Sequence, residues 1–250
     1  MRLQDRVVIV TGGANGIGRV YATQLCAEGA KVVVADLDIA NAEATATALN
    51  ESTQRDAALA VRVDVTSEAD TNMLAAATLE RFGRIDVLVN NAGTYPHVDF
   101  ERIDYAAWQK VIRVNLDSVF LCTKAVLPAM TAQGAGKVIN IATNLVWVGL
   151  PGMVHYIAAK AGIIGFTRAL AREVGGRGIT VNALAPGAVI PGGPFSETAK
   201  QRIAQIVDHQ CVKRPQRPDD LVGSLLFLAS RDSDFVSGQI ITVDGGLTNH

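Results

Sequence analysis

Short apolar runs rich in β-branched residues recur along this chain and alternate with longer stretches of helical periodicity. Strand-like runs cover residues 7–10, 31–35, 59–63, 85–89, 138–141, 180–184 and 239–243. Helical spacing covers residues 18–28, 40–50, 68–82, 106–130 and 154–174. Strands that alternate with helices form parallel sheets, because each right-handed crossover lays a helix against the sheet. The pattern predicts an α/β fold: a single domain over residues 1–250, with a doubly wound, seven-stranded parallel sheet and helices on both faces.

Composition narrows the class of protein and of partner. With 250 residues, 49% of them hydrophobic, and a net charge of -1, the chain can bury a large core and has no general field for nucleic acid or an anionic membrane. Its three cysteines, Cys26, Cys122 and Cys211, match no disulfide or zinc pattern. No apolar run approaches the roughly 18 residues of a membrane span. We expect a cytoplasmic protein with a local binding site, and no nucleic-acid or membrane partner.

A glycine-rich segment, residues 11–18, follows the first predicted strand and opens the first helix. Glycines let the backbone turn tightly and approach a pyrophosphate, whose charge is met by amide groups at the helix N-terminus. An ordinary glycine-rich turn is the alternative, but the strand-turn-helix context favours nucleotide binding. The residues expected at the cofactor are Gly12, Asn15, Gly16, Ile17 and Gly18.

Asp36 stands at the end of the second predicted strand. A carboxylate at this position accepts hydrogen bonds from ribose hydroxyls and repels a 2'-phosphate. No Arg or Lys lies between Thr11 and Gly18 to attract that phosphate. The alternative is a surface turn, since Asp38 is nearby. We predict that the cofactor is NAD rather than NADP.

Polar segments also follow the third and fourth predicted strands, as Asp64-Val65 and Asn90-Asn91-Ala92-Gly93. Asp and Asn are common in turns, so either segment alone is compatible with turn chemistry. Because the carboxyl ends of parallel strands meet at one edge of a sheet, we predict that the two segments together form one cofactor edge. The residues concerned are Asp64, Val65, Asn91, Ala92 and Gly93.

Tyr156 and Lys160 are four residues apart in a predicted helix, so both side chains can point from one helix face. An ammonium near a phenol favours the phenolate and brings its pKa toward working pH. Alone, such a pair is more often a partly buried aromatic beside a solvated cation. The glycine-rich segment and the polar strand ends favour an acid/base pair.

With these motifs in place, the chain resembles the short-chain dehydrogenase/reductase family over essentially its whole length, which implies a Rossmann-type sheet. The matching residues are Thr11, Gly12, Gly16, Gly18, Asp64, Asn90, Asn91, Ala92, Gly93, Asn115, Tyr156, Lys160, Asn182, Pro186 and Gly187. The segments 94–96 and 243–247 are similar to those of members that oxidise hydrophobic or aromatic secondary alcohols with NAD.

The resemblance implies a mechanism. Tyr156 would take the alcohol proton as hydride passes to the nicotinamide, and Lys160 would lower the pKa of Tyr156 and hold the nicotinamide ribose. Asn115 would join a water relay from Lys160 to solvent. Pro186, Gly187 and the backbone near Val189 would lie at the nicotinamide. The resemblance also implies a homotetramer built on the predicted helices 106–130 and 154–174, with residues 244–250 near a subunit contact.

Two residues depart from the family pattern. The family usually has Ser thirteen residues before its Tyr, and this chain has Thr143, which keeps the hydroxyl and adds a methyl group. The family commonly has Thr four residues after its Pro-Gly pair, near the nicotinamide amide, and Pro191 stands there in this chain. We expect Thr143 to keep its catalytic role and Pro191 to remove one cofactor contact.

Apolar side chains near these positions are expected to form the substrate walls. They are Tyr95, Leu145, Trp147, Val148 and Met153, with a substrate loop near residues 188–212 and further wall residues in 195–212. Core or subunit packing is the alternative for these side chains. His97 and His155 have no neighbouring ligand pattern, so we expect packing roles and no metal site.

We therefore predict an NAD-dependent oxidoreductase that interconverts a secondary alcohol and a ketone on a small, apolar or aromatic substrate. Its catalytic residues would be Asn115, Thr143, Tyr156 and Lys160. One alternative is a 3-oxoacyl thioester reductase that uses NADPH, which Asp36 disfavours. The other is a non-catalytic NAD-binding scaffold, which would have no need of a proton relay.

Overall fold

A single parallel sheet organises the chain in the computed structural model, which describes residues 1–190 and 197–248. The strand order is β3-β2-β1-β4-β5-β6-β7, and every neighbouring pair is parallel. The strands are β1 (Val7–Thr11), β2 (Lys31–Asp36), β3 (Ala58–Arg62), β4 (Val87–Asn90), β5 (Gly136–Ile141), β6 (Ile179–Pro186) and β7 (Ile240–Val243). The predicted doubly wound, seven-stranded sheet is confirmed.

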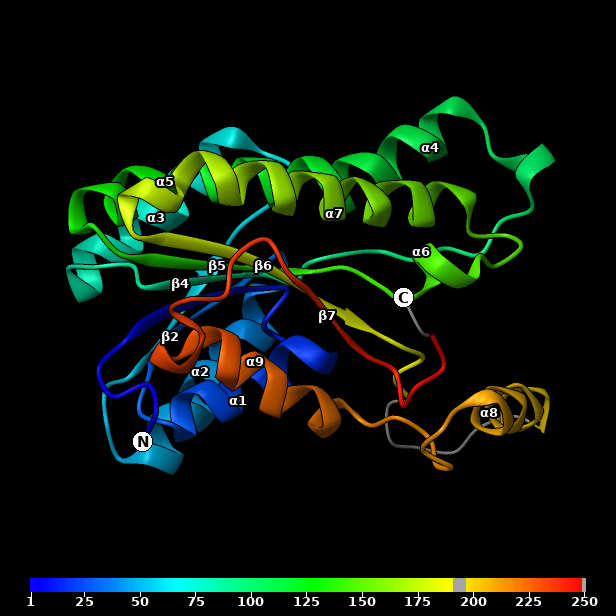
Figure 1. Cartoon of the computed structure of the whole chain (residues 1–250). Helices are drawn as coiled ribbons and strands as arrows, with labels where there is room; N and C mark the ends of the chain where they lie inside the picture. The colour runs from blue at the N-terminus through cyan, green and yellow to red at the C-terminus, as the bar shows by residue number, and fades with distance from the viewer. Residues whose placement is uncertain (191–196, 249–250) are drawn as a thin grey trace.

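Helices cover both faces of the sheet (Figure 1). On one face lie α1 (Gly16–Ala27), α2 (Ile39–Thr53) and α9 (Val222–Ala229), and on the other α3 (Glu68–Phe82), α4 (Tyr105–Ile112), α5 (Ser118–Gln133) and α7 (Val154–Val174). Every residue of β1, β4 and β5 is buried, as expected of central strands with both faces covered. Within the described ranges, no helix is both long and apolar enough to cross a bilayer.

Three helices and one irregular turn depart from the sequence expectations. The predicted helix 106–130 consists of α4, a π-helical turn (Arg113–Asp117) and α5. A helix, α8 (Glu197–His209), occupies much of the segment that we expected to be a loop. The short helices α9 and α6 (Leu145–Val148) were also not predicted. Apolar runs as short as that of α9 do not distinguish a strand from a helix by periodicity.

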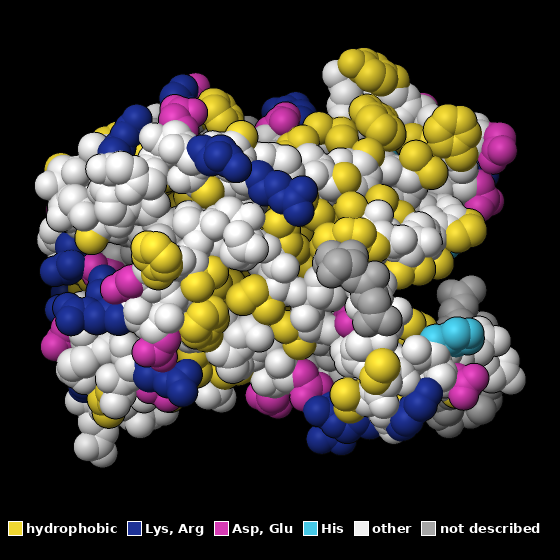
Figure 2. Space-filling model, in the orientation of Figure 1, with side chains coloured by type: hydrophobic (Ala, Val, Ile, Leu, Met, Phe, Trp, Pro, Cys, Tyr) yellow, Lys and Arg dark blue, Asp and Glu magenta, His cyan; other side chains and the backbone are white. Residues whose placement is uncertain are grey.

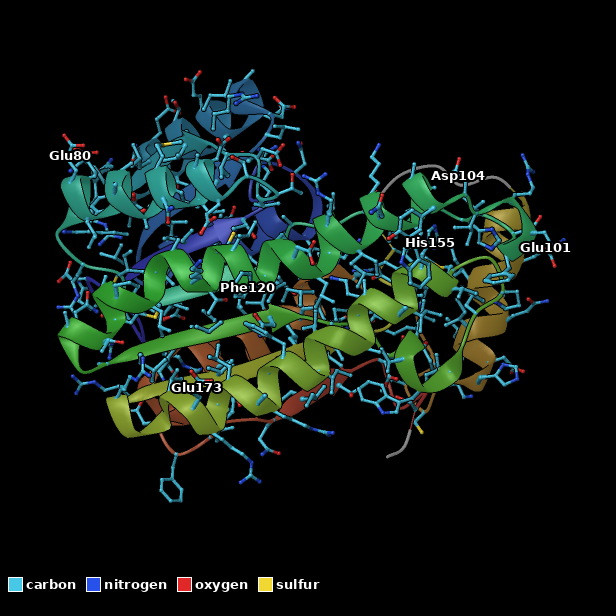
Figure 3. All side chains as sticks on the ribbon, turned by 90° about the horizontal axis from the view of Figure 1, so that it is seen from above. Glu80, Glu101, Asp104, Phe120, His155 and Glu173 are labelled. Carbon is cyan, nitrogen blue, oxygen red and sulfur yellow. The ribbon has the colours of Figure 1, made fainter. Side chains whose placement is uncertain are left out.

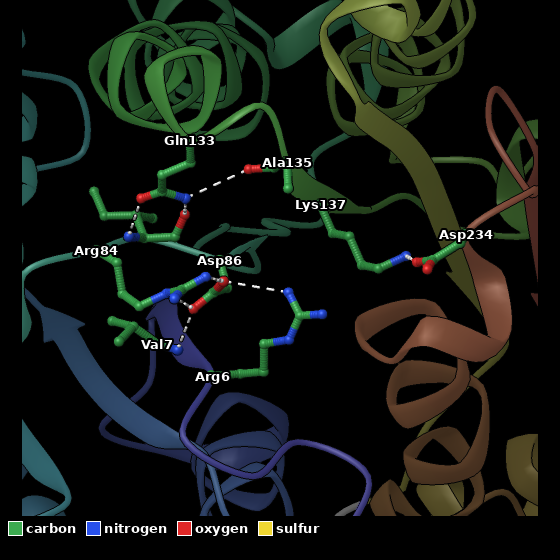
Figure 4. A network of polar contacts seen from close by, with 9 residues as sticks. Arg6, Val7, Arg84, Asp86, Gln133, Ala135, Lys137 and Asp234 are labelled. Atoms are coloured by element: carbon green, nitrogen blue, oxygen red, sulfur yellow. Dashed lines mark hydrogen bonds and ion pairs between the residues drawn. The ribbon is translucent and has the colours of Figure 1, made fainter.

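A buried ionic network lies at the amino ends of the strands (Figure 4). Asp86 is 1% exposed and accepts hydrogen bonds from the Val7 amide and from the guanidinium groups of Arg6 and Arg84. Its own amide donates to Val7 O, so the start of β4 is tied to the start of β1. A buried carboxylate is costly unless donors of this kind satisfy it. The network therefore stabilises the edge of the sheet opposite the carboxyl ends.

Strand order reverses between β1 and β4, since β2 and β3 lie on one side of β1 and β4 to β7 on the other. In a doubly wound sheet, ligands bind beyond the carboxyl ends of the strands at this point. The ends concerned are Thr11 and Asn90. The glycine-rich segment and the segment after β4 begin there.

Candidate active site

The glycine-rich segment turns sharply from β1 into α1. Gly12 and Gly16 have φ angles of +63° and +54°, in the left-handed region that favours glycine. A Cβ atom on Gly18 would lie 2.0 Å from Gly12 O, so only glycine allows the helix to pack this closely against the turn. A Cβ on Gly16 would meet nothing within 4 Å, which leaves open space at the start of the helix.

The N-terminus of α1 presents backbone donors at this turn. The Arg19 amide donates to Asn15 O, and the Asn15 side chain makes no capping hydrogen bond. The described residues offer no acceptor to the amides of Gly16, Ile17 and Gly18. Together with the helix dipole, these amides suit a negatively charged group such as a pyrophosphate.

Asp36 and Asp38 have separate roles. Asp36 Oδ2 accepts a hydrogen bond from the Ala14 amide at 3.0 Å, so its carboxylate lies against the glycine-rich turn. Asp38 caps α2 by accepting from the Asn41 amide at 3.2 Å. Leu37, between them, is 58% exposed.

The exit of β4 is bound to the exit of β1. The Asn91 side chain donates to Thr11 O at 3.0 Å and to Gly12 O at 3.1 Å. Thr11 Oγ1 accepts from the amides of Asn91 and Ala92. A Cβ on Gly93 would lie 2.8 Å from Asn115 Oδ1, so glycine permits the close approach of that side chain. The structure thus brings these two predicted segments together.

Asp64 lies farther along the same edge, after β3. Its Oδ1 accepts from the Thr66 amide at 2.9 Å and from the Thr66 hydroxyl at 2.7 Å. Turn chemistry therefore accounts for one carboxylate oxygen. Val65, next in the chain, is buried.

Thr143, Tyr156 and Lys160 meet at the end of β5. Thr143 follows that strand, while Tyr156 and Lys160 lie one turn apart near the start of α7. The Lys160 ammonium donates to Ile141 O at 2.7 Å and lies 5.8 Å from the centroid of the Tyr156 ring. Thr143 lies close enough to the Tyr156 hydroxyl for a hydrogen bond that lowers the pKa of the phenol. The three predicted catalytic side chains therefore form one cluster.

The surroundings of Tyr156 correct one expectation. Burial raises the pKa of Tyr156 to about 12, the Thr143 hydrogen bond lowers it, and Tyr95 raises it. Burial lowers the pKa of Lys160 to about 8. We expected Lys160 to lower the pKa of Tyr156, but burial raises that pKa, and the Lys160 ammonium donates its hydrogen bond to Ile141 O instead. At neutral pH, Tyr156 is consequently a protonated phenol that can donate a proton.

Asn115 lies in the π-helical turn and is fully buried. Its Oδ1 accepts from the Thr94 amide at 3.2 Å, and its Nδ2 donates to Thr94 O at 2.8 Å and Val111 O at 3.0 Å. Both amide hydrogens are thus used by backbone carbonyls. In this arrangement the side chain anchors the segment after β4 to the helix behind it.

Most of the predicted substrate walls lie near this cluster. The Tyr95 ring packs edge-on against Tyr156 with centroids 6.5 Å apart. Leu145 donates its amide to Thr143 Oγ1, and Trp147 lies with it on α6, both half-buried. Met153 is buried at the start of α7, while Val148 is half-exposed. Residues 191–196, including Pro191 and Phe195, lie outside the described residues.

The segment after β6 is held by the strand and loop beside it. The Gly187 amide donates to Val243 O at 3.0 Å, and a Cβ on Gly187 would lie 2.9 Å from Asp244 Cβ. Val189 forms a parallel bridge with Gln216, and the Ile190 amide donates to Gln216 O. The backbone that carries Pro186, Gly187 and Val189 is therefore fixed next to the end of β7.

The two histidines near the site show no ligand pattern. His155 is fully buried at the start of α7, on the side toward α4 (Figure 3), and burial lowers its pKa. The His97 ring fits against Gly152, where a Cβ would lie 2.2 Å from the ring. Within residues 1–190 and 197–248, no group of three His, Cys, Asp or Glu side chains could hold a metal ion.

Comparison with known proteins agrees with this geometry. A family model described as enoyl-(acyl carrier protein) reductase matches residues 12–248. The chain is 39% identical to subunit BbsD of (2S)-[(R)-hydroxy(phenyl)methyl]succinyl-CoA dehydrogenase from Thauera aromatica, over 98% of both chains. It is also 39% identical to a 3-oxoacyl-[acyl-carrier-protein] reductase from Synechocystis, again over 98% of both.

A further relative and a solved structure extend the comparison. Cis-4-hydroxycyclohexanecarboxylate dehydrogenase from Sinomonas cyclohexanicum is 39% identical, over 98% of this chain and 97% of that protein. A crystal structure from Sinorhizobium meliloti 1021, described as a short-chain alcohol dehydrogenase, superposes with a TM-score of 0.92 at 30% identity, over 98% and 97% of the two chains. The chain belongs to the short-chain dehydrogenase/reductase family and is an oxidoreductase of that family.

Proposed function

We propose that this protein interconverts a secondary alcohol and a ketone with NAD as the hydride carrier. The observation that carries the proposal is the cluster of Tyr156, Thr143 and Lys160 at the carboxyl edge of the sheet. In this cluster a phenol, an alcohol donor and a buried amine converge, and an acid/base group needs such neighbours to exchange a proton with a substrate oxygen. A non-catalytic scaffold would not need them.

Each side chain has a distinct role in the proposed reaction. When bound, the nicotinamide accepts hydride from the carbinol carbon or returns it to the ketone carbon. Tyr156 gives a proton to the ketone oxygen or takes one from the alcohol. Thr143 donates a hydrogen bond to that oxygen, and Lys160 binds the nicotinamide ribose. We also propose that Asn115 joins a water relay that carries protons between Lys160 and solvent.

The residues of the carboxyl edge fit a dinucleotide. The open space at Gly16 and the amides of Gly16, Ile17 and Gly18 suit a pyrophosphate. We assign the adenosine ribose to Asp36. The remaining proposed contacts are Gly12, Asn15, Asp64, Val65, Asn91, Ala92 and Gly93 along the edge, with Tyr156, Lys160, Pro186, Gly187 and Val189 toward the nicotinamide.

NADH is expected to bind at least about tenfold more tightly than NADPH, because the Asp36 carboxylate would repel a 2'-phosphate. Asp36→Ala should narrow this preference, since it removes both the ribose hydrogen bonds and the repulsion. The measurement is a fluorescence titration of both reduced cofactors. Asp38→Ala is the matched control, because Asp38 caps α2 and should leave the preference unchanged. Equal affinities in the unmodified protein would contradict the assignment.

For the substrate, we propose a small alcohol or ketone with an apolar or aromatic body, bounded by Tyr95, Leu145, Trp147 and Met153 and by the 188–212 segment. Tyr95 is 75% exposed beside Tyr156, as a wall that a ligand could cover. Two relatives at 39% identity have names that include a phenyl or a cyclohexane group. A panel of secondary alcohols with NAD, followed by NADH absorbance, tests the proposal.

A 3-oxoacyl thioester reductase is the second candidate, because one relative at 39% identity carries that name. Such a reductase would use NADPH, and the Asp36 carboxylate would repel the 2'-phosphate of that cofactor. Faster turnover of an acetoacetyl thioester with NADPH than of any alcohol with NAD would favour this candidate.

We also propose a cytoplasmic location, because the three cysteines are free thiols rather than disulfides.

A homotetramer is proposed from the apolar outer faces of α4, α5 and α7. Figure 2 shows hydrophobic side chains gathered over α4 and the start of α7. Tyr105 on α4, Phe120 on α5 and Val154 on α7 are exposed. Sedimentation at micromolar concentration should give a tetramer. Phe120→Asp should shift it to smaller species, because the substitution would bury a charge, whereas Met73→Asp on α3 should not. A monomeric unmodified protein would refute the proposal.

A further inference from the structure

Asn144 directly follows Thr143 and connects the end of β5 to its neighbours. Its amide donates to Pro186 O at 3.0 Å, at the end of β6. Its side-chain Nδ2 donates to Asp244 Oδ2 at 3.1 Å, just after β7. Asn144 and Asp244 are 1% and 3% exposed. One residue therefore joins the exits of three adjacent strands.

Within the part of the chain that the structure describes, only neutral donors bind the Asp244 carboxylate. Besides Asn144, its carboxylate accepts from the amides of Gly246, Leu247 and Thr248 and from the Thr248 hydroxyl. Because a carboxylate only accepts, the Asn144 side chain must present its NH₂ group. Removal of that donor leaves a buried carboxylate oxygen with fewer partners, which is unfavourable.

Gly187 lies beside the Asp244 end of this bond. A Cβ atom on Gly187 would be 2.9 Å from both Asp244 Cβ and Gln216 Oε1, so its backbone is wedged against the segment after β7. Thr143 directly precedes Asn144, at the other end of the bond. The bond thus spans the segment proposed for the nicotinamide and ends beside the hydroxyl proposed for the substrate oxygen.

We propose that the Asn144–Asp244 hydrogen bond is a positioning clamp, which holds Thr143 and the Pro186-Gly187 segment in register. The proposal rests on the oxidoreductase function proposed above. Hydride and proton transfer must occur at one substrate carbon and its oxygen, so a small relative shift of the two segments slows the reaction. Neither Asn144 nor Asp244 needs to touch the substrate for this role.

The first test is kinetic. Asn144→Ala should lower kcat by about tenfold or more while the Kd for NADH changes by less than about threefold, because alignment is lost and the cofactor contacts remain. Asn144→Asp should lower kcat further, because it places a second carboxylate against that of Asp244. The double variant Asn144→Asp/Asp244→Asn reverses donor and acceptor and should be faster than Asn144→Asp alone. Asn144→Ser retains a donor and serves if the other variants fold poorly.

The second test does not depend on turnover. Amide hydrogen exchange in peptides covering residues 142–148 and 184–190 should be about fivefold faster in Asn144→Ala than in the unmodified protein. Asn50→Ala is the matched control: its side chain bridges Ala57 and Ala58 at the other edge of the sheet. Unchanged exchange in residues 184–190 would overturn the clamp even if the protein oxidised no alcohol. Unchanged kcat in an active protein would overturn it without affecting the proposed function.

Discussion

Tyr156→Phe is expected to lower kcat for alcohol oxidation by about 10³-fold or more, because it removes the only proton carrier proposed to touch the substrate oxygen. The ring still packs beside Tyr95, so the Kd for NADH should change by less than about twofold. Steady-state kinetics with one alcohol, together with an NADH titration, give both quantities. Lys160→Ala should impair turnover and NADH binding together, since Lys160 is proposed to hold the ribose as well.

A matched control is available in Tyr21. Its hydroxyl is buried and has no hydrogen-bond partner among the described residues, so Tyr21→Phe removes the same atom without loss of a contact. That variant should retain its activity and stability. If Tyr156→Phe keeps more than a few per cent of the unmodified activity, the proton is carried elsewhere and the assignment of Tyr156 is wrong.

The fold was predictable because its signals are local. Strands with all residues buried give continuous apolar runs, and their alternation with helices implies parallel order. The π-helical turn at Asn115 was not predictable, because it depends on hydrogen bonds from that side chain to Thr94 and Val111. Helix α8 was missed because its apolar residues are few, so a polar segment after Pro-rich sequence looked like a loop.

The site was predictable at positions where the local structure accepts only one type of residue. Gly18 is such a case, since its packing against Gly12 excludes any side chain. The environment of Tyr156 was not predictable, because it includes Tyr95, which is distant in the sequence, packs against the Tyr156 ring and raises the pKa of the phenol. Asn144 and Asp244 are 100 residues apart in the chain, and no sequence spacing indicates that they meet.

Thr143 is the position at which this chain departs from its family and at which chemistry and packing can be separated. Its hydroxyl is hydrogen-bonded to Tyr156 and accepts from the Leu145 amide at 3.3 Å. The Leu145 amide occupies one lone pair, and the single hydroxyl hydrogen can be donated to the Tyr156 oxygen or to a substrate oxygen. If that hydrogen is donated to the developing oxyanion, its loss is felt chiefly in the transition state.

Thr143→Val should therefore lower kcat/KM by about 10²- to 10³-fold, or roughly 2 to 4 kcal/mol, whereas Thr143→Ser should stay close to the unmodified protein. Val also removes the hydrogen bond that lowers the pKa of Tyr156, so that pKa should rise. Ketone reduction needs the protonated phenol, so the Thr143→Val variant should keep its ketone-reducing activity to higher pH than the unmodified protein. Thr78→Val, in a buried helix position far from the cluster, controls for the substitution itself. If Thr143→Val kept a kcat/KM near that of the unmodified protein while Thr143→Ser lowered it, Thr143 would only fill space.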